Sequence, residues 1–332
     1  MAARRDPVIR WGVIGPGGIA QRFANAMTAV HDGEIVAVAS RSLDRANAFG
    51  DEHGIARRYD DEQALADDPQ VDAVYVATPH ARHEADTIRC LEAGKPVLCE
   101  KPLALNAGQA QRMVDAAAAA GLFLMEAVWS RFLPSYRALV DVLGSGRIGT
   151  PLQVEADFGF RVPVDPTHRL FDPQQGGGAL LDLGIYPIQL CTLALGPVEQ
   201  AVAQGRLGDT GVDEQVAAVL RHEGGGLGVV RAAITVPLAC TARISGTDGW
   251  IDLPPFMHCP TSLTVHSVGA APEAIDAPIG VEGLEHEISE VHRCLAAGLR
   301  ESPTMPLAES VALASVMDDI RAQVGVVYPG ER

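Results

Sequence analysis

A glycine-rich turn near the start of the chain constrains the fold more than any other feature of the sequence. The apolar run VIRWGVIG, typical of a buried strand, leads through this turn into the helical pattern AQRFANAMTAV. Glycine permits a tight turn and a close approach of the backbone to a pyrophosphate, and the helix that follows directs free N–H groups at that anion. A Gly-x-Gly-x-x-Ala match between a strand and a helix therefore predicts a dinucleotide-binding site, with the candidate contact residues Gly15, Gly17, Gly18 and Ile19.

Strand-like and helix-like patterns then alternate up to residue 127. Further strands are predicted at 34–40, 72–79, 96–102 and 122–127, with helical patterns between them. This order is typical of a parallel, doubly wound sheet, which binds ligands at the carboxyl ends of its strands. Two polar segments fall at such ends and are candidate cofactor contacts: Thr78 with Pro79, and Glu100 with Lys101.

The end of the second predicted strand indicates which nicotinamide cofactor binds. An NAD-specific site would place Asp or Glu there to bind the ribose hydroxyls, whereas this chain has Ser40 and Arg41. An arginine can form a bidentate, charge-assisted pair with a 2′-phosphate, and a serine can donate to it. We therefore expect NADP as the cofactor, and NAD stays possible because Asp44 is close in sequence.

Beyond residue 127 the pattern changes, and the length of 332 residues already favours two domains. Hairpin-like strands follow one another with glycine-rich turns, and helices are predicted around 177–195, 281–298 and 307–324. We therefore predict an α/β protein with a dinucleotide-binding Rossmann domain over 1–127, built on a doubly wound parallel sheet. An α+β domain over 128–332 would serve substrate binding and oligomerisation. Its open, mostly antiparallel sheet would have helices on one face, and the apolar strand LGVVRAAITV indicates that a subunit partner covers the other.

Charge and cysteine content exclude several classes of partner. The chain has 42 acidic and 26 basic side chains, a net charge of −16, which repels nucleic acid and anionic membranes. Arg4 and Arg5 are not followed by the long apolar stretch of a signal peptide, so we do not expect one. The apolar helical segment VDAAAAAGLFLM is too short to cross a bilayer. The six cysteines form no Cys-x-x-Cys pair, as in a reduced cytosolic protein. We expect a cytoplasmic protein.

Two histidine patterns suggest metal sites, and neither is convincing. HEISEVH (286–292) resembles a zinc-binding helix motif, but Glu290 stands where the second ligand should be, so we expect a solvent-exposed helix face. His80 and His83 lie beside the nucleotide site with no third ligand nearby in sequence, so we expect them at a helix start. We predict no metal.

In the second half of the chain, the segment GGGALLDLGIYPIQ (176–189) contains the clearest candidates for proton transfer. Asp182 and Tyr186, four positions apart, share one face of the predicted helix. Pro187 removes a backbone donor, so the helix should kink or restart there. We expect the glycines to let the chain approach the nicotinamide without a side-chain clash. A tyrosine on an apolar helix is, taken alone, more often a core residue.

In their order and spacing, these features resemble the glucose–fructose oxidoreductase / inositol dehydrogenase (Gfo/Idh/MocA) family. The resemblance rests on the early glycine turn, the Thr78-Pro79-x-x-x-His83 segment, the Glu100-Lys101-Pro102 turn and the glycines before Asp182. Within that family the stretches MEAVWSRFLP, HRLFDPQQGGGALLDLGIYPI and ISGTDGWIDLP are most similar to the dimeric dihydrodiol dehydrogenase and NADP-dependent D-xylose 1-dehydrogenase branch.

The resemblance implies Lys101 and Tyr186 as the catalytic pair, Asp182 in contact with substrate hydroxyls, His83 in the cofactor site, and a homodimer or dimer-based oligomer. A nearby ammonium favours the phenolate form of a tyrosine, which lets it act as a base in oxidation and an acid in reduction. Trp129 and Arg131 are tentative substrate contacts, and a core tryptophan with a surface arginine fits the pattern almost as well.

The expected function is an NADP-dependent oxidoreductase that transfers a hydride between the nicotinamide and a cyclic polyol. The substrate would be a small sugar or diol, reacting at an aldose C1 hydroxyl or as a trans-dihydrodiol. One alternative is an NADPH-dependent ketoreductase of a nucleotide-linked deoxysugar. The other is a non-catalytic NADP-sensing regulator, which the presence of both Lys101 and Tyr186 disfavours.

Overall fold

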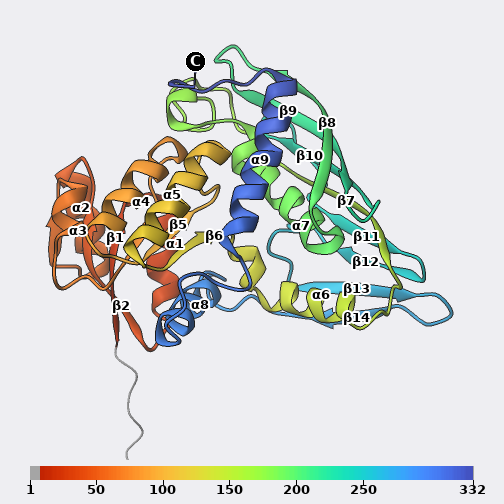
Figure 1. Cartoon of the computed structure of the whole chain (residues 1–332), viewed down its shortest axis with the longest axis horizontal. Coiled ribbons are helices and arrows are strands. Elements are labelled where there is room, and N and C mark those ends of the chain that lie inside the picture. The colour runs from red at the N-terminus through yellow and green to blue at the C-terminus, as the bar shows by residue number, and fades with distance from the viewer. Residues whose placement is uncertain (1–7, 332) are drawn as a thin grey trace, which may run out of the picture. The chain divides into compact units, whose positions relative to one another are not determined.

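A parallel sheet forms the centre of the first of two units in the computed structural model, which describes residues 8–331 (Figure 1). Arg4 and Arg5 lie outside the described residues. The strand order is β3-β2-β1-β4-β5-β6, and each neighbouring pair is parallel. The order reverses between β1 and β4, which confirms the predicted doubly wound sheet. The bounds are β1 Ile9–Ile14, β2 Gly33–Ala39, β3 Arg57–Tyr59, β4 Ala73–Val76, β5 Val97–Glu100 and β6 Leu124–Ala127.

Helices follow the strands of this sheet in the order that the alternating pattern predicts. Apolar side chains between sheet and helices form the core, in which the rings of Phe23 and Tyr75 stack at 4.0 Å between centroids and Trp11 meets Phe23 edge-on at 5.4 Å. The helices are α1 Gly18–Met27, α2 Leu43–His53, α3 Glu62–Ala66, α4 His83–Glu92 and α5 Ala107–Ala120, with a 3₁₀ turn at His80–Arg82.

One segment from late in the chain returns to this first unit. By its contacts Gly280–Ser310, including α8 (Glu285–Ala296), belongs with residues up to Trp129. The His292 ring explains the return: Trp11 Nε1 donates to its Nε2 at 2.9 Å, and its Nδ1 lies 2.9 Å from Asp32. The second domain expected over 128–332 is therefore interrupted in the structure.

The predicted solvent-exposed face at 286–292 is wrong. Glu287 is completely buried and His292 is 3% exposed, because this side of α8 packs on the first unit. Burial and the nearby charge of Glu100 raise the pKa of Glu287 well above its usual range. The polar pattern of the segment therefore reflects buried groups instead of a solvated surface. His292 is hydrogen-bonded, whereas the Glu287 carboxylate oxygens have no hydrogen-bond partner among the described residues.

The second unit is built on a sheet with the strand order β14-β13-β12-β11-β7-β10-β9-β8. Only the β7–β10 pair is parallel among its described neighbours, so the sheet is mostly antiparallel, as expected. Sequence patterns missed β8 and β14, which are rich in polar residues. The bounds are β7 Pro151–Gly159, β8 Val198–Leu207, β9 Asp213–His222, β10 Leu227–Ala233, β11 Ala242–Gly246, β12 Gly249–Leu253, β13 Ser262–Ser267 and β14 Glu273–Asp276.

Helices α7 (Ile185–Leu195) and α9 (Leu307–Val324) cover one face of this sheet, while α6 (Pro134–Gly144) contacts β13 (Figure 1). Gln323 of α9 bonds to the backbone of Ala201 and Ala203 on β8. The stretch Pro173–Leu195 is long and apolar enough to cross a membrane, but 78% of its most apolar window is buried, as in the core helix of a soluble domain. It therefore gives little evidence for a membrane protein.

The other face of the sheet carries an apolar row. Val202, Val219 and Val229 are neighbours across β8, β9 and β10, and their side chains are 59%, 45% and 36% exposed. Val230 and Ala232 alternate with them and are buried. The strand LGVVRAAITV thus presents apolar side chains on both faces, one of them uncovered by the described residues of this unit.

Candidate active site

The glycine turn of the first unit leaves the start of α1 open. No side chain caps the helix at Gly17, and the first turn of the helix contains no acidic residue. A Cβ at Gly15, where φ is +89°, would lie 2.8 Å from the Ala77 carbonyl oxygen, whereas a Cβ at Gly18 would meet nothing within 4 Å. The Thr78 hydroxyl is buried without a hydrogen-bond partner among the described residues. These features suit a pyrophosphate, which accepts from free N–H and O–H donors.

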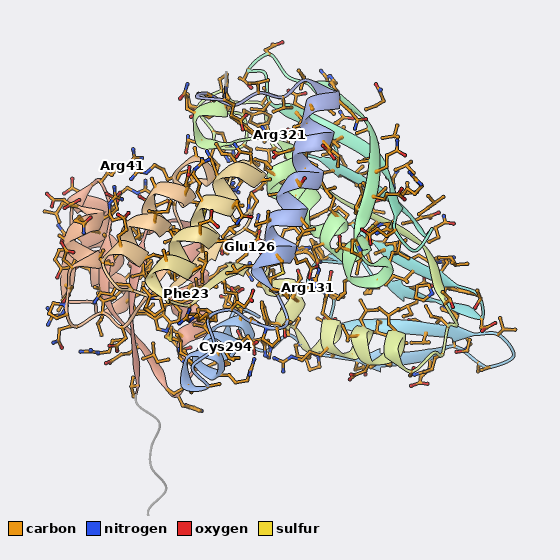
Figure 2. The ribbon with its side chains drawn as sticks, viewed as in Figure 1. Phe23, Arg41, Glu126, Arg131, Cys294 and Arg321 are labelled. Carbon is orange, nitrogen blue, oxygen red and sulfur yellow. The ribbon has the colours of Figure 1, made fainter. Side chains whose placement is uncertain are left out.

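Lys101 begins a turn that buried polar groups hold from several sides. The Glu100 carboxylate accepts from the Tyr75 hydroxyl at 2.5 Å and from the Lys101 backbone N–H at 3.2 Å. Glu126 on β6 accepts from the Leu103 N–H at 2.8 Å, and Figure 2 labels this residue. Burial, and then the charge of Glu100, raise the pKa of Tyr75 well above its usual range. Glu100 therefore serves this turn as a hydrogen-bond acceptor within the first unit.

His83 joins the ends of β4 and β5. Its Nδ1 lies 2.8 Å from the Pro102 carbonyl oxygen, and its Nε2 lies 2.8 Å from that of Thr78. The ring is completely buried, which lowers its pKa, while the two carbonyl contacts oppose that shift. His80 precedes it in the 3₁₀ turn, with the ring centroids 5.6 Å apart. The helix-start position expected for both histidines is confirmed.

The end of β2 presents the residues expected at the 2′-position of the ribose. The Ser40 hydroxyl accepts from the Ser42 N–H at 3.3 Å, and the Ser40 side chain is buried. Arg41 is exposed at the start of the α2 segment, as Figure 2 shows. Asp44 lies in the first turn of α2. An exposed guanidinium next to a buried hydroxyl is compatible with an anionic ligand group.

In the second unit the three glycines are crowded by their own chain. A Cβ at Gly177 would lie 2.7 Å from the carbonyl oxygens of Arg169 and Leu170. A Cβ at Gly178, where φ is +122°, would lie 2.3 Å from Asp213 Oδ1. We expected these glycines to make room for a nicotinamide; in the structure, protein atoms take that room. Packing inside this unit therefore explains why positions 177 and 178 require glycine.

The helix after the glycines begins with a π-helical turn, Leu180–Gly184, before α7 starts at Ile185. The Ile185 N–H bonds to the Leu180 carbonyl, five positions earlier. Pro187 thus lies in the first turn of α7, where its missing N–H does no harm, and the predicted restart is confirmed. Asp182 lies in the π-helical turn and not in an α-helix. Such turns are rare and often mark functional sites.

Arg169 holds the Asp182 carboxylate with two hydrogen bonds. Its Nη1 lies 2.9 Å from Oδ1 and its Nη2 lies 3.3 Å from Oδ2. Asp182 is 4% exposed, whereas the arginine side chain is 51% exposed. Both terminal nitrogens of the guanidinium therefore bond to the buried carboxylate, which fixes the half-exposed arginine side chain in place. Sequence analysis left the role of Arg169 open.

Two rings beside Tyr186 escaped sequence analysis. The Phe158 ring meets Tyr186 edge-on at 5.6 Å, and the His258 ring lies 5.0 Å from Tyr186 and stacks on Phe158 at 4.2 Å. Tyr186 is 5% exposed. Phe158 occurs in an alternating strand pattern that many core residues share, and His258 lies in a loop without a motif, so neither gave a signal. Phe158 and His258 thus place two aromatic rings beside the Tyr186 phenol.

The tentative substrate residues have partners within their own units. The Arg22 guanidinium lies 4.9 Å from the centre of the Trp129 ring, which is buried. Arg131 is 5% exposed, and its guanidinium bonds to the Gln189 side chain and, at 3.0 Å, to the Gln189 carbonyl oxygen. The alternative of a surface arginine is therefore wrong. Arg131 braces α7 three positions after Tyr186.

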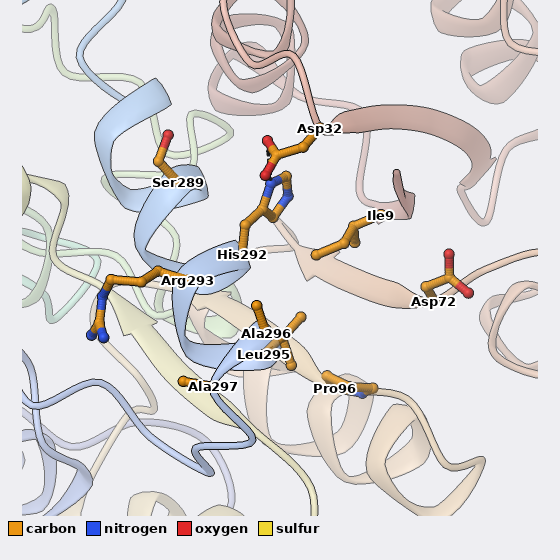
Figure 3. Close-up of a pocket in the computed structure, with 10 residues that line it drawn as sticks. All are labelled: Ile9, Asp32, Asp72, Pro96, Ser289, His292, Arg293, Leu295, Ala296 and Ala297. Carbon is orange, nitrogen blue, oxygen red and sulfur yellow. Dashed lines mark hydrogen bonds and ion pairs between the residues drawn. The ribbon is translucent and has the colours of Figure 1, made fainter. Parts of the chain in front are cut away.

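A hollow of about 710 Å³ lies elsewhere in the first unit (Figure 3). Its walls include Ile9, Asp72 and Pro96, which stand at the amino ends of β1, β4 and β5, together with His292 of α8. This is the opposite edge of the sheet from the glycine turn and Lys101. No group of three potential metal-ligating side chains occurs among residues 8–331.

The predicted site residues therefore fall into two sets. The first unit holds the glycine turn, the β2 end, the Thr78 and Lys101 turns, and Trp129; the second holds Asp182, Tyr186 and Arg131. Each set is organised by contacts within its own unit, and the two polypeptide surroundings differ in kind. The first set offers backbone N–H donors at the uncapped start of α1, and the second set offers side chains on and before α7.

Two solved structures have a fold similar to that of this chain. KijD10, a 3-ketoreductase from Actinomadura kijaniata solved with NADP and TDP-benzene, is 29% identical, with a TM-score of 0.85 over 96% of this chain and 98% of that chain. An aldose-aldose oxidoreductase from Caulobacter crescentus shares the fold, with a TM-score of 0.86 at 24% identity over 96% and 97% of the two chains.

Sequence comparisons place the chain in a family. Trans-1,2-dihydrobenzene-1,2-diol dehydrogenase from Danio rerio is 40% identical over 329 residues, covering 96% of this chain and 98% of the relative. The Homo sapiens enzyme of the same name is 38% identical over 334 residues, covering 98% and 99%. The model of the oxidoreductase family with an NAD-binding Rossmann fold matches residues 9–128, and that of the GFO/IDH/MocA C-terminal domain matches 136–252. The chain therefore belongs to the GFO/IDH/MocA family of nicotinamide-dependent oxidoreductases.

Proposed function

We propose that this protein is an NADP-dependent dehydrogenase that oxidises a CH–OH group of a cyclic polyol, an aldose at C1 or a trans-dihydrodiol. The observation that carries the proposal is the phenol of Tyr186, set in a wall formed by Phe158 and His258. An aromatic wall beside a group that can transfer a proton suits a ring-shaped alcohol. The names of the dihydrodiol dehydrogenases at 38–40% identity support the same class of substrate.

The residues present fit a dinucleotide. In the proposal Gly15, Gly17 and Gly18, with Ile19, hold the pyrophosphate at the open start of α1, and the Thr78 hydroxyl donates to the ligand. Pro79 and His83 shape the neighbouring strand end. Ser40 and Arg41 bind the 2′-phosphate, which is the basis for NADP over NAD. When bound, the cofactor supplies the acceptor for the substrate hydride.

The chain itself must move the hydroxyl proton. Tyr186 takes this proton during oxidation and returns it during reduction, and the Lys101 ammonium stabilises the phenolate that the transfer requires. Glu100 and His83 hold the backbone from which Lys101 projects. Asp182, held in place by Arg169, orients the substrate by contacting its hydroxyls.

A substrate screen tests the proposal. Aldoses, trans-dihydrodiols and ketosugars are offered with NADP or NAD, or with the reduced cofactors for the ketosugars, and absorbance of the reduced nicotinamide is followed. We expect turnover of a cyclic polyol with NADP, and its near-complete loss in Lys101→Ala while NADP still binds. Turnover of Lys101→Ala at the wild-type rate would contradict the mechanism.

A ketoreductase of a nucleotide-linked deoxysugar is the second candidate. It is favoured by the likeness to KijD10, whose structure holds TDP-benzene and NADP at 29% identity. The same tyrosine and lysine would then deliver a proton to the carbonyl oxygen. Oxidation of NADPH by nucleotide-linked ketosugars, with no polyol oxidised, would select this candidate. Cofactor binding without any turnover would select a regulator.

We also propose a cytoplasmic homodimer, or an oligomer built from dimers. The uncovered row Val202, Val219 and Val229 supports a partner subunit, because exposed apolar patches of this kind mark interfaces. Val219→Lys should convert the dimer to monomers in a mass measurement in solution, with Leu227→Lys, on β10, as a second probe of the same face. A wild-type mass equal to one chain at all concentrations would reject the dimer.

A further inference from the structure

Asp213, the first residue of β9, is a completely buried carboxylate that the proposed chemistry does not use. Its Oδ2 accepts from the Leu180 backbone N–H at 2.6 Å. Leu180 is the first residue of the π-helical turn that leads into α7. The carboxylate therefore occupies the start of the helix that carries Asp182 and Tyr186, where free N–H groups and the helix dipole favour a negative charge.

The glycine at position 178 is matched to this carboxylate. Any Cβ there would lie 2.3 Å from Asp213 Oδ1 and 3.4 Å from the Tyr328 hydroxyl, and φ at this position is +122°. Both the backbone conformation and the space thus require glycine. The last glycine of the sequence GGG and the aspartate, 35 positions apart in the printed sequence, therefore form one packing unit.

A second group holds the same loop from the C-terminal segment. The Tyr328 hydroxyl donates to the Gly177 carbonyl at 2.6 Å. Arg321 of α9 lies 4.9 Å from the centre of the Tyr328 ring and pairs with Asp318 and Glu331. The loop is therefore held by one acceptor, Asp213, at the Leu180 N–H and by one donor, Tyr328, at the Gly177 carbonyl.

We propose that Asp213 is a positioning residue for the reactive helix. Its buried carboxyl group clamps the first turn by accepting the hydrogen bond from the Leu180 N–H and thereby fixes where Asp182 and Tyr186 lie. The catalytic part of this inference rests on the proposed function, since it takes Tyr186 as the proton-transferring group. The clamp itself is a property of the second unit and can be measured without turnover.

The clamp has a pH dependence. Burial raises the pKa of Asp213 to about 7, against the opposing effects of the Leu180 N–H and the Arg321 charge. The other ionisable groups around it are Tyr328, whose pKa burial raises well above its usual range, and Glu214, whose carboxylate pairs with Arg206 at 3.4 Å. Because the pKa is raised in the clamped state, protonation of Asp213 favours that state, and the carbonyl oxygen of the protonated carboxyl can still accept from the Leu180 N–H; the clamp therefore loosens as pH rises to about 7.

Three variants test the clamp. Asp213→Ala removes the acceptor, Asp213→Asn keeps an acceptor oxygen without the charge, and Glu214→Gln is the matched control on the same strand. Hydrogen exchange of residues 176–186, NADP affinity by fluorescence, and kcat and KM are measured from pH 5.5 to 9. Loss of a helix cap typically costs about 0.5–2 kcal/mol, equivalent to a change of up to about 30-fold.

For Asp213→Ala we expect hydrogen exchange in 176–186 to become about tenfold faster and kcat to fall about tenfold, with the NADP affinity within about twofold of wild type. Asp213→Asn should restore most of kcat. Wild-type protection of 176–186, corrected for intrinsic exchange, should fall as pH rises to about 7 and then stay level, whereas in Asp213→Asn it should be independent of pH. If Asp213→Ala does not fold, the comparison of wild type with Asp213→Asn across pH still tests the clamp.

The outcomes separate the clamp from the proposed reaction. Unchanged exchange in Asp213→Ala, or the same pH dependence in wild type and Asp213→Asn, overturns the clamp even if the wild type turns over its substrate. A wild type without turnover whose variants still show raised exchange rejects the reaction and keeps the clamp. Equal changes in Glu214→Gln would mean that β9 is merely destabilised, which also overturns the specific role of Asp213.

Discussion

Two glycine-rich turns, each followed by a helix, serve opposite purposes in this molecule. At Gly17 and Gly18 the helix start is free of side-chain caps and has open space around it. At Gly177 and Gly178 backbone carbonyls and a buried carboxylate fill the space, and Asp213 caps the helix start. The same residue type is thus used once to leave a helix start free and once to close it.

The difference shows how each turn contributes to function. An uncapped helix start offers backbone N–H groups to a ligand anion, so the turn itself is the binding element. At the capped start Asp213 already accepts from the Leu180 N–H, so we expect the chemistry to come from side chains further along, here Asp182 and Tyr186. A glycine-rich turn before a helix therefore predicts anion binding only where no protein carboxylate reaches it.

The largest effect is expected from Tyr186→Phe, which removes the reacting side chain behind the closed turn. Loss of a positioned acid–base group should lower kcat by about 10²–10⁴-fold, while NADP affinity, set by the open turn, stays the same. Steady-state kinetics and cofactor titration measure both. Tyr59→Phe, which removes a hydroxyl bonded to Asp68, is the matched control and should leave kcat within about twofold. A mild loss in Tyr186→Phe would mean that another group moves the proton.

The closed turn should also give the protein an unusual dependence of stability on pH. The pKa of Asp213 is about 7 in the folded state against an ordinary value of 3.8, so the folded state keeps a proton that the unfolded chain has lost between these values. The contribution of this group to stability is therefore full below about pH 4 and is lost as pH rises to about 7. Relative to wild type, Asp213→Asn should gain up to roughly 4 kcal/mol across this window.

Urea unfolding of the two proteins at several pH values measures this difference. The comparison between variant and wild type cancels the titration of other groups that both proteins share. A difference that stays constant from pH 4 to 8, or that moves in the opposite direction, would show that the Asp213 carboxylate titrates near its ordinary value.

A pair of identical substitutions contrasts the two turns directly. Gly178→Ala forces a side chain into the Asp213 carboxylate at a left-handed φ, and strain of this kind costs roughly 1–3 kcal/mol before the clash is counted. Gly18→Ala has room for its methyl group and should leave the thermal midpoint nearly unchanged. Calorimetry measures the thermal midpoint of both variants. Equal midpoints would show that the two turns do not differ in how tightly they are packed.

The smallest effect is expected from Arg41→Ala, at the rim of the open site. Loss of a charge-assisted bond of roughly 1.5–3 kcal/mol should weaken NADP by about 10–100-fold and leave NAD almost unaffected. Affinities for both cofactors are measured by fluorescence titration. Arg45→Ala, one turn further on α2, is the control. An equal loss for NADP and NAD would mean that Arg41 does not contact the 2′-phosphate.

Much of the first unit could be predicted because its signals are local. The run VIRWGVIG, the glycine turn and the helical pattern after it are adjacent in sequence, and the repetition of strands and helices implies one parallel sheet. The restart of the helix near Pro187 was predictable for the same reason, since proline acts on its own turn.

What could not be predicted depends on residues far apart in the chain. Nothing near 286–292 indicates that His292 would bond to Trp11. Phe158 and His258 surround Tyr186 only because β7 and the loop after β12 meet α7 in the folded unit. A polar residue is identified as buried and paired only when its partner is known.

The sequence by itself determined the family, the Rossmann sheet with its open glycine turn, and the identity of the groups able to move a proton, because short-range patterns and residue chemistry suffice for these. Only the tertiary structure decided that the second glycine turn is closed. Asp213 reaches Leu180 from 33 positions away, and Gly178 makes the room for it. Such a contact depends on how a strand and a helix pack together, which local sequence patterns do not encode.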